Sequence, residues 1–159
     1  MIERQLTINY IEYASVEEMD AQDQILVAAA DEARGGSYSP YSLFRVGAAV
    51  RLVNGVIVKG ANQENCAYPS GLCAERVAMF AAGAQYPGVA FDTIAIEGAN
   101  INEICESPAA PCGACRQVMA EYQRLFERPL KIILIGSRRI YKFAKVEDLL
   151  PLIFDSLRV

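Results

Sequence analysis

Short runs of apolar residues rich in Val, Ile and Ala recur along the chain between turn residues. Runs of this kind are typical of buried or half-buried β-strands. Asn54-Gly55 separates the first two runs, and an Asn-Gly pair is a strong signal for a β-hairpin turn. The pattern predicts five strands, over residues 46–53, 56–61, 93–98, 131–136 and 139–143. A weaker run over residues 6–13 is a candidate for an additional edge strand.

Other segments repeat their apolar residues at the spacing of an α-helix. The first predicted helix begins at Ser15, which has the S-x-x-E spacing of a capping box with Glu18, and it stops at Gly35-Gly36. Strands interspersed with helices indicate an α/β fold around one mixed sheet, partly antiparallel because of the hairpin. The predicted helices cover about residues 15–34, from about 73 to between Gly83 and Pro87, and about 113–127, with a last helical turn at 146–150.

The charge balance bears on the class of ligand. The chain of 159 residues has 15 Lys and Arg against 19 Asp and Glu, which gives a net charge of −4. Nucleic-acid binding depends largely on basic side chains that neutralise phosphates, so a polynucleotide substrate is disfavoured and a small uncharged ligand fits better. No apolar run approaches the roughly 20 residues of a membrane helix, and no secretory signal follows Met1. We expect a cytoplasmic protein without membrane contact.

The sequence contains five cysteines and no histidine. The odd number of cysteines, without an export signal, argues against a disulfide framework. The absence of histidine excludes Ser-His and Cys-His nucleophile pairs and every His-ligated metal site. Acid–base chemistry in this protein must therefore use Glu, Asp, Lys, Tyr or Cys.

Cys112 and Cys115 form a C-x-x-C pair at the start of a predicted helix, and their spacing places both sulfurs on one helical face. Alone, such a pair is compatible with a structural zinc site, a redox-active dithiol or two ligands of a catalytic metal. Cys73 opens the preceding helix and favours the third reading. A four-thiolate structural site would need Cys66 or Cys105, and neither forms a second C-x-x-C. We expect these two to be small core residues.

Glu75 follows Cys73 by two residues and can reach a metal-site water without binding the metal. Three protein ligands with an open fourth position are characteristic of catalytic zinc, and a nearby carboxylate can move protons there. Arg76, Arg116 and two helix N-termini are available to offset the charge of three thiolates. We interpret Arg76 as a partner of the ligands in preference to a solvated surface arginine.

Four segments carry a resemblance to a known family. The chain resembles the small homotetrameric, zinc-dependent cytidine deaminases of the cytidine and deoxycytidylate deaminase superfamily. The resemblance implies a single three-layer α/β domain over residues 21–159, with a mixed, mostly five-stranded sheet flanked by helices, and an N-terminal extension over residues 1–20. The matching segments are "YSPYSLFRVGAAV" (38–50), "NQENCAYPSGLCAERVAMF" (62–80), "PCGACRQVM" (111–119) and "VEDLLPLIF" (146–154).

The resemblance also implies the chemistry. Cys73, Cys112 and Cys115 would hold one zinc ion per chain, and Glu75 would be the catalytic proton shuttle. Hydrolytic attack would occur at C4 of the cytosine ring, while Glu75 delivers protons to N3 and to the departing ammonia.

Five further residues match substrate-binding positions of the family. Asn62 and Glu64, in "NQEN", would hydrogen-bond the ribose 3′-hydroxyl, although they could also be simple turn residues after the hairpin. Phe44 would pack on the pyrimidine ring, although a strand phenylalanine is more often plain core. Tyr68 would line the same pocket, and Phe154 would reach the pocket of a neighbouring subunit in a homotetramer.

The sequence therefore predicts zinc-dependent hydrolytic deamination of cytidine and 2′-deoxycytidine to uridine and 2′-deoxyuridine plus ammonia, in pyrimidine salvage. The nearest alternative is a deaminase of a nucleoside antibiotic such as blasticidin S, which the intact "NQEN" run disfavours. The non-enzymatic alternative is a structural-zinc or redox module.

Overall fold

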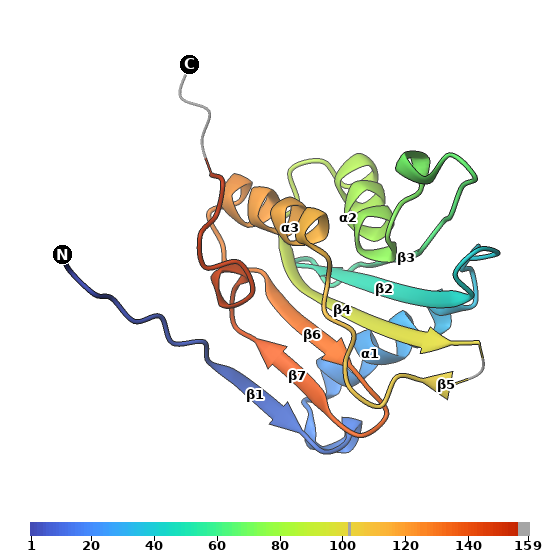
Figure 1. The fold of residues 1–159 in the computed structure, drawn as a ribbon, viewed down its shortest axis with the longest axis horizontal. Coiled ribbons are helices and arrows are strands. Elements are labelled where there is room, and N and C mark those ends of the chain that lie inside the picture. Colours follow the sequence, from blue (N-terminus) through green and yellow to red (C-terminus); the bar gives the residue numbers. More distant parts are fainter. Residues whose placement is uncertain (102, 156–159) are drawn as a thin grey trace.

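The computed structural model describes residues 1–101 and 103–155 and has one seven-stranded sheet at its centre (Figure 1). Six strands follow each other in the order β1-β7-β6-β4-β2-β3, and β5 pairs with β4. All pairs are antiparallel except β4 with β6, so the sheet is mixed. The strands are β1 Tyr10–Tyr13, β2 Phe44–Leu52, β3 Ile57–Ala61, β4 Phe91–Asn100, β5 Glu103–Ile104, β6 Lys131–Ile135 and β7 Ile140–Phe143.

Helices cover both faces of the sheet and complete the predicted three-layer α/β fold (Figure 1). Helix α1 lies on one face, and α2 and α3 lie on the other. In the described residues no helix combines the length and the apolar character that crossing a membrane requires. The helices are α1 Ala21–Arg34, α2 Ala74–Gln85 and α3 Gly113–Leu125, with single 3-10 turns η1 Val16–Glu18, η2 Tyr68–Ser70 and η3 Val146–Asp148.

The alternation of side chains along the central strands explains the two-sided core. On β4, Ile94 and Ile96 pack with α2 and α3, whereas Ala95 packs with α1. On β6, Ile132 packs toward α2 and α3, and Ile133 packs toward α1. Successive strand residues point to opposite faces, so a strand buried on both faces is apolar throughout. This is why these strands appear in the sequence as continuous apolar runs.

Most of the predicted helices and strands agree with the structure, but one strand was missed and one helix begins later than predicted. All five predicted strands form, and the edge strand expected within residues 6–13 is confirmed as β1. The short strand β5 was missed. The first helix begins at Ala21, not at Ser15, because the Asp20 side chain accepts a hydrogen bond from Asp23 N at 2.9 Å and caps it. The Glu18 carboxylate instead accepts from Ala14 N at 2.8 Å.

Strand β3 and helix α2 approach each other more closely than side chains would allow. A Cβ atom on Gly60 would lie 2.4 Å from Ala78 N and 2.8 Å from Ala74 O. Both atoms belong to the helix backbone, so the helix would have to shift to make room. The glycine therefore fixes the first turns of α2, which contain Glu75 and follow Cys73, against the sheet.

We expect Gly60→Ala to destabilise the protein by about 3 kcal/mol through overpacking, which lowers the thermal midpoint by roughly 6–12 °C. Thermal unfolding followed by circular dichroism checks this. Gly36→Ala is the matched control, because its Cβ would meet nothing closer than Ala33 O at 3.4 Å. A midpoint for Gly60→Ala equal to that of Gly36→Ala would contradict the close approach.

Candidate active site

Two helix N-termini bring three cysteines together. Cys73 is the N-cap residue of α2, Cys112 is the N-cap residue of α3, and Cys115 lies in the first turn of α3. The Sγ atoms of Cys73 and Cys112 are 3.8 Å apart, and those of Cys112 and Cys115 are 3.5 Å apart. All three sulfurs lie within 4.8 Å of one another. The structure thus assembles the three predicted ligands from segments 39 positions apart.

The three sulfurs fit a zinc ion. Tetrahedral zinc–thiolate bonds of about 2.3 Å separate the sulfurs by roughly 3.8 Å, close to the two distances found here. Three thiol ligands are a donor set that zinc prefers, and a fourth position stays open to the pocket. The cluster accordingly suits one zinc ion per chain. Cys66 and Cys105 belong to no such group in the described part of the chain.

Positive partial and full charges surround the sulfurs. Both helix N-termini favour thiolates. The Arg76 Nη2 atom lies 3.7 Å from Cys73 Sγ. Hydrogen bonding from Cys115, together with Arg76 and Cys112, lowers the pKa of the Cys73 thiol to about 5, whereas its bond to Cys73 and its burial raise the pKa of the Cys115 thiol. Of these two thiols, Cys73 therefore loses its proton first.

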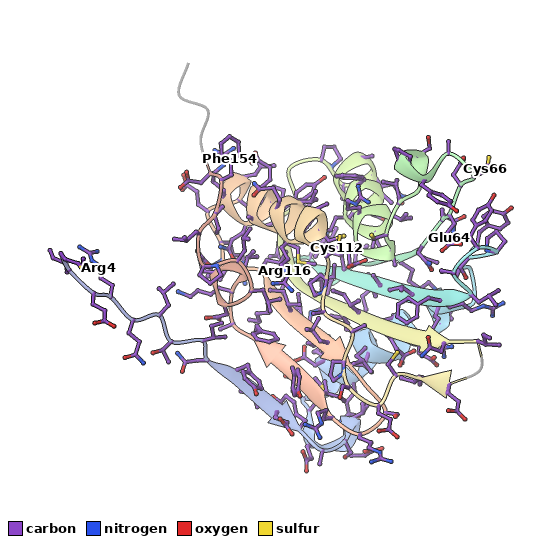
Figure 2. The ribbon with its side chains drawn as sticks, in the orientation of Figure 1. Arg4, Glu64, Cys66, Cys112, Arg116 and Phe154 are labelled. Carbon is purple, nitrogen blue, oxygen red and sulfur yellow. The ribbon has the colours of Figure 1, made fainter. Side chains whose placement is uncertain are left out.

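Arg116 directs its hydrogen bonds to backbone carbonyl groups, and within the described residues it makes no hydrogen bond to the three sulfurs. Its guanidinium donates to the carbonyl oxygens of Pro111, at 2.8 Å, and Leu149, at 2.7 Å. These bonds tie the start of α3 to the chain that precedes it and to the C-terminal segment. Figure 2 shows Arg116 beside Cys112 at this end of the helix.

Glu75 lies in the first turn of α2 and is 4% exposed. Burial, followed by the negative charge of Cys73, raises the pKa of its carboxyl group. Its side chain lines the same cavity as Cys73 and Cys112. A buried carboxyl group next to an open metal position is placed to exchange protons with whatever occupies the cavity.

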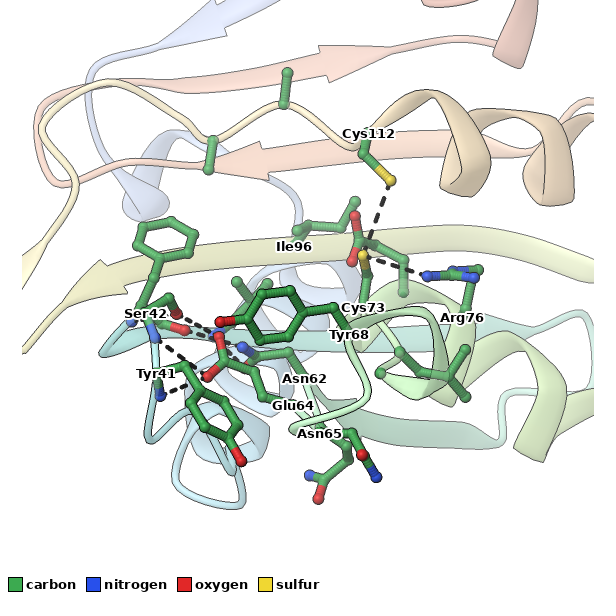
Figure 3. A pocket seen from close by; sticks show the side chains of 18 residues that line it. Tyr41, Ser42, Asn62, Glu64, Asn65, Tyr68, Cys73, Arg76, Ile96 and Cys112 are labelled. Carbon is green, nitrogen blue, oxygen red and sulfur yellow. Dashed lines mark hydrogen bonds between the residues drawn. The ribbon is translucent and has the colours of Figure 1, made fainter.

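The cavity beside the cysteines has a volume of about 700 Å³ (Figure 3). Its size is in the ordinary range for small-molecule sites. Cys73 and Cys112 lie on one side of it in Figure 3, and Asn62 and Glu64 lie on the other. Phe44, Ile96 and Ala109 supply apolar surface to its wall.

The Asn62 side chain is oriented by three hydrogen bonds. Its Oδ1 atom accepts from Val46 N at 2.8 Å and from the Ser37 hydroxyl, and its Nδ2 atom donates to Phe44 O at 2.9 Å. Both lone pairs of Oδ1 are thereby used, so Asn62 offers the cavity an N–H donor.

Glu64 is held as an acceptor. Its carboxylate accepts hydrogen bonds from the Ser42 hydroxyl and from the backbone N–H groups of Tyr41 and Ser42, at 2.9 and 3.2 Å. The Ser42 hydroxyl and these backbone groups lower the pKa of Glu64. A donor from Asn62 and an acceptor from Glu64 suit one hydroxyl group of a ligand. Both residues follow β3, and both line the cavity.

Of the three remaining predicted substrate-binding residues, two line the cavity and one does not. Phe44 and Tyr68 both line the cavity, and Tyr68 packs edge-to-face on Tyr41 with ring centroids 6.0 Å apart. Phe154 is 65% exposed and lies outside the cavity of its own chain, and its carbonyl accepts from Gln117 Nε2 at 2.7 Å. Figure 2 shows it at the far end of α3 from Cys112.

Two sequence-based interpretations need correction or extension. Cys66 is exposed, and the prediction that it is a core residue was wrong, whereas Cys105 is partly buried. Cys66 follows the exposed Asn65 in a loop that projects from the edge of the sheet (Figure 2). Sequence reasoning also missed Ser42 as the partner of Glu64. The Ser-Pro-Tyr-Ser turn before β2 was the available signal.

Comparisons with known proteins agree with this geometry. The model of the cytidine and deoxycytidylate deaminase zinc-binding region matches residues 20–126. A cytidine deaminase of Halalkalibacterium halodurans is 41% identical over 128 residues, which is 80% of this chain and 90% of that protein. Another from Sporosarcina psychrophila is 45% identical over 98 residues, 61% of this chain and 67% of that protein.

A solved structure shares the fold as well. The crystal structure of a cytidine deaminase from Burkholderia pseudomallei is 39% identical, with a TM-score of 0.72, and the match covers 86% of this chain and all of that one. The family match spans the metal cluster, Glu75 and the Asn62–Glu64 pair. On this ground the chain belongs to the cytidine and deoxycytidylate deaminase family.

Proposed function

We propose that this protein catalyses the hydrolytic deamination of cytidine and 2′-deoxycytidine to uridine and 2′-deoxyuridine plus ammonia. The observation that carries the proposal is one cavity with a buried carboxyl group beside three thiols on one side and a matched donor–acceptor pair on the other. The carboxyl group and the thiols suit a reaction at the nucleobase, and the donor–acceptor pair suits a hydroxyl group of the sugar. The cytidine deaminases to which the chain is similar support this substrate.

Each residue has a defined part in the proposed reaction. Cys73, Cys112 and Cys115 hold the zinc ion, and Arg76 offsets their charge. A zinc ion in such a site acts as a Lewis acid and generates a hydrolytic nucleophile at neutral pH. Glu75 would take one proton from the attacking water and deliver it to N3 of the cytosine ring. It would then take the second proton from the hydroxyl group formed at C4 and deliver it to the departing ammonia, as the C4–N bond breaks.

The substrate assignment is tested by following the loss of cytosine absorbance with cytidine, 2′-deoxycytidine, cytosine, CMP and blasticidin S in parallel. We expect turnover of the two nucleosides. The carboxylate of Glu64 disfavours the phosphate of CMP, and Arg76, the one Lys or Arg among the residues described as lining the cavity, lies beside Cys73. Turnover of blasticidin S alone would identify an antibiotic deaminase, and no turnover with zinc bound would indicate a structural site.

Asn62→Ala is expected to raise KM for cytidine roughly 30- to 100-fold, because it removes a donor to the ribose and leaves polar groups unpaired. Steady-state kinetics with cytidine and 3′-deoxycytidine check the assignment. If Asn62 binds the 3′-hydroxyl, the substitution affects 3′-deoxycytidine much less than cytidine. An equal effect on both substrates would mean that Asn62 acts only by holding Val46 and Phe44.

We further propose a homotetramer in which Phe154 enters the pocket of a neighbouring subunit. Its exposed ring and its position outside the cavity of its own chain support this role. Residues 21–159 would form the catalytic domain and residues 1–20 an extension. A nucleoside substrate suits a cytoplasmic enzyme of pyrimidine salvage.

Phe154→Ala is expected to raise KM for cytidine about five- to tenfold through loss of an aromatic contact, with the mass of a tetramer retained in light scattering. Leu152→Ala is the matched control, because Leu152 is 85% exposed and has no assigned contact with substrate. Equal KM values for the two variants would contradict a role of Phe154 in the pocket.

A further inference from the structure

The side of the cavity that is formed by the sheet contains a glycine, Gly98, to which the proposed reaction assigns no role. Strand β4 carries Gly98 directly opposite Val46 of β2, and the next pair on the same face of the sheet is Phe44 with Asn100. Gly98 is thus the diagonal neighbour of Phe44. Since Ile96 lines the cavity and side chains alternate, position 98 is on the cavity face too.

A side chain at position 98 would collide with the pocket wall. A Cβ atom there would lie 2.8 Å from Phe44 Cζ, 3.4 Å from Phe44 Cε1 and 3.0 Å from Ala109 Cβ. Both Phe44 and Ala109 line the cavity. The Phe44 ring therefore lies directly over the bare backbone of Gly98.

The backbone itself does not require glycine at this position. In the described residues the glycines with positive φ are Gly55 and Gly88, and Gly98 is not among them. A glycine inside a strand weakens the strand, and it often marks a place where another group approaches closely. The groups that approach here are the Phe44 ring, at 2.8 Å from the position that a Cβ atom would take, and the Ala109 methyl group, at 3.0 Å.

Phe44 has little freedom to avoid a new side chain except by turning its ring. Its carbonyl accepts from Asn62 Nδ2 at 2.9 Å, and its N–H donates to the Ser42 hydroxyl at 3.0 Å. The main chain is thus anchored on both sides, and it is paired with β4. A ring displaced from Gly98 has to rotate away from the strand and changes the shape of the cavity.

We infer that Gly98 is a positioning residue for the pyrimidine ring of the substrate. It acts through Phe44 by letting the tip of that ring approach β4 closely, which sets the width of the part of the cavity that holds the base. This inference rests on the proposed function, because it assigns the Phe44 side of the cavity to the cytosine ring.

The test combines kinetics with a double-mutant cycle. Gly98→Ala is expected to raise KM for cytidine about tenfold through misplacement of the ring, with kcat changed less than about threefold because the zinc ligands and Glu75 are untouched. In a Phe44→Ala background, Gly98→Ala should add no further change in KM, since the ring that it displaces is gone. Gly36→Ala is the matched control and should keep the KM of the unmodified protein.

Three results would overturn the inference: an unchanged KM in Gly98→Ala, a loss confined to kcat, or the same KM increase with and without the Phe44 ring. Crystal structures of the unmodified protein and of Gly98→Ala give a readout independent of activity, in which the Phe44 ring is expected to be rotated off β4. An unmoved ring would also overturn the inference. Failure of the unmodified protein to act on cytidine would refute the proposed function, while the structures would still decide whether Gly98 positions Phe44.

Discussion

Glu75→Gln is expected to lower kcat for cytidine by about 100- to 10,000-fold, the range typical of a lost general acid–base group. Glutamine has nearly the shape of glutamate but cannot carry a proton between water, N3 and the leaving ammonia. The buried position of Glu75 at the start of α2 leaves no other carboxyl group on this side of the cavity among its described lining residues. Steady-state kinetics at saturating cytidine measure the effect.

The zinc content of the Glu75→Gln variant distinguishes a catalytic role of Glu75 from a structural one. Because Glu75 is no ligand, Glu75→Gln should retain one zinc ion per chain by atomic absorption. Glu121→Gln is the matched control, since Glu121 lies on the exposed face of α3 and pairs only with Arg124 in the described structure. A kcat for Glu75→Gln within tenfold of that of Glu121→Gln would exclude Glu75 as the proton shuttle.

Cys115→Ala is expected to abolish deamination by removing the most buried of the three ligands. Two remaining thiols bind zinc far more weakly than three, so zinc should be lost during purification. Binding to the folded state alone stabilises a protein by mass action. A strong chelator should therefore lower the thermal midpoint of the unmodified protein and leave that of Cys115→Ala unchanged.

Cys105→Ala is the matched control for the loss of zinc and activity in Cys115→Ala. Cys105 directly follows β5 in the sequence, is partly buried and lies outside the metal cluster. Its substitution should therefore preserve zinc content, activity and the response to chelator. Full zinc content in Cys115→Ala, or loss of zinc in Cys105→Ala, would contradict the ligand assignment.

The sequence was sufficient for those parts of the molecule that local patterns encode. The five main strands appear as apolar runs because both faces of the sheet are covered. The cysteines were recognisable because two of them share one helical turn and the third opens a helix of its own. The structure adds their mutual distances, which no spacing in the sequence determines.

Contacts between segments far apart in the sequence could not be predicted from local patterns. Strand β5 contains two residues, Glu103 and Ile104, which is too short for any periodicity. Ser15 precedes only the 3-10 turn η1, whereas the Asp20 side chain caps α1. The contact of Phe44 with Gly98 joins two strands that are 54 positions apart, and neither residue is unusual when it is seen alone.

Strand β1 has a consequence for the order in which the chain folds. Tyr10 pairs with Phe143, so the first strand to leave the ribosome pairs with one of the last. At synthesis rates of about 5–20 residues per second, β1 waits roughly 7–27 s for its partner. The rest of the sheet can form during that time, from β2 and β3 to the hairpin of β6 and β7. Closure of the β7 edge by β1 is then a late step, which follows the synthesis of both helices that position the cysteines.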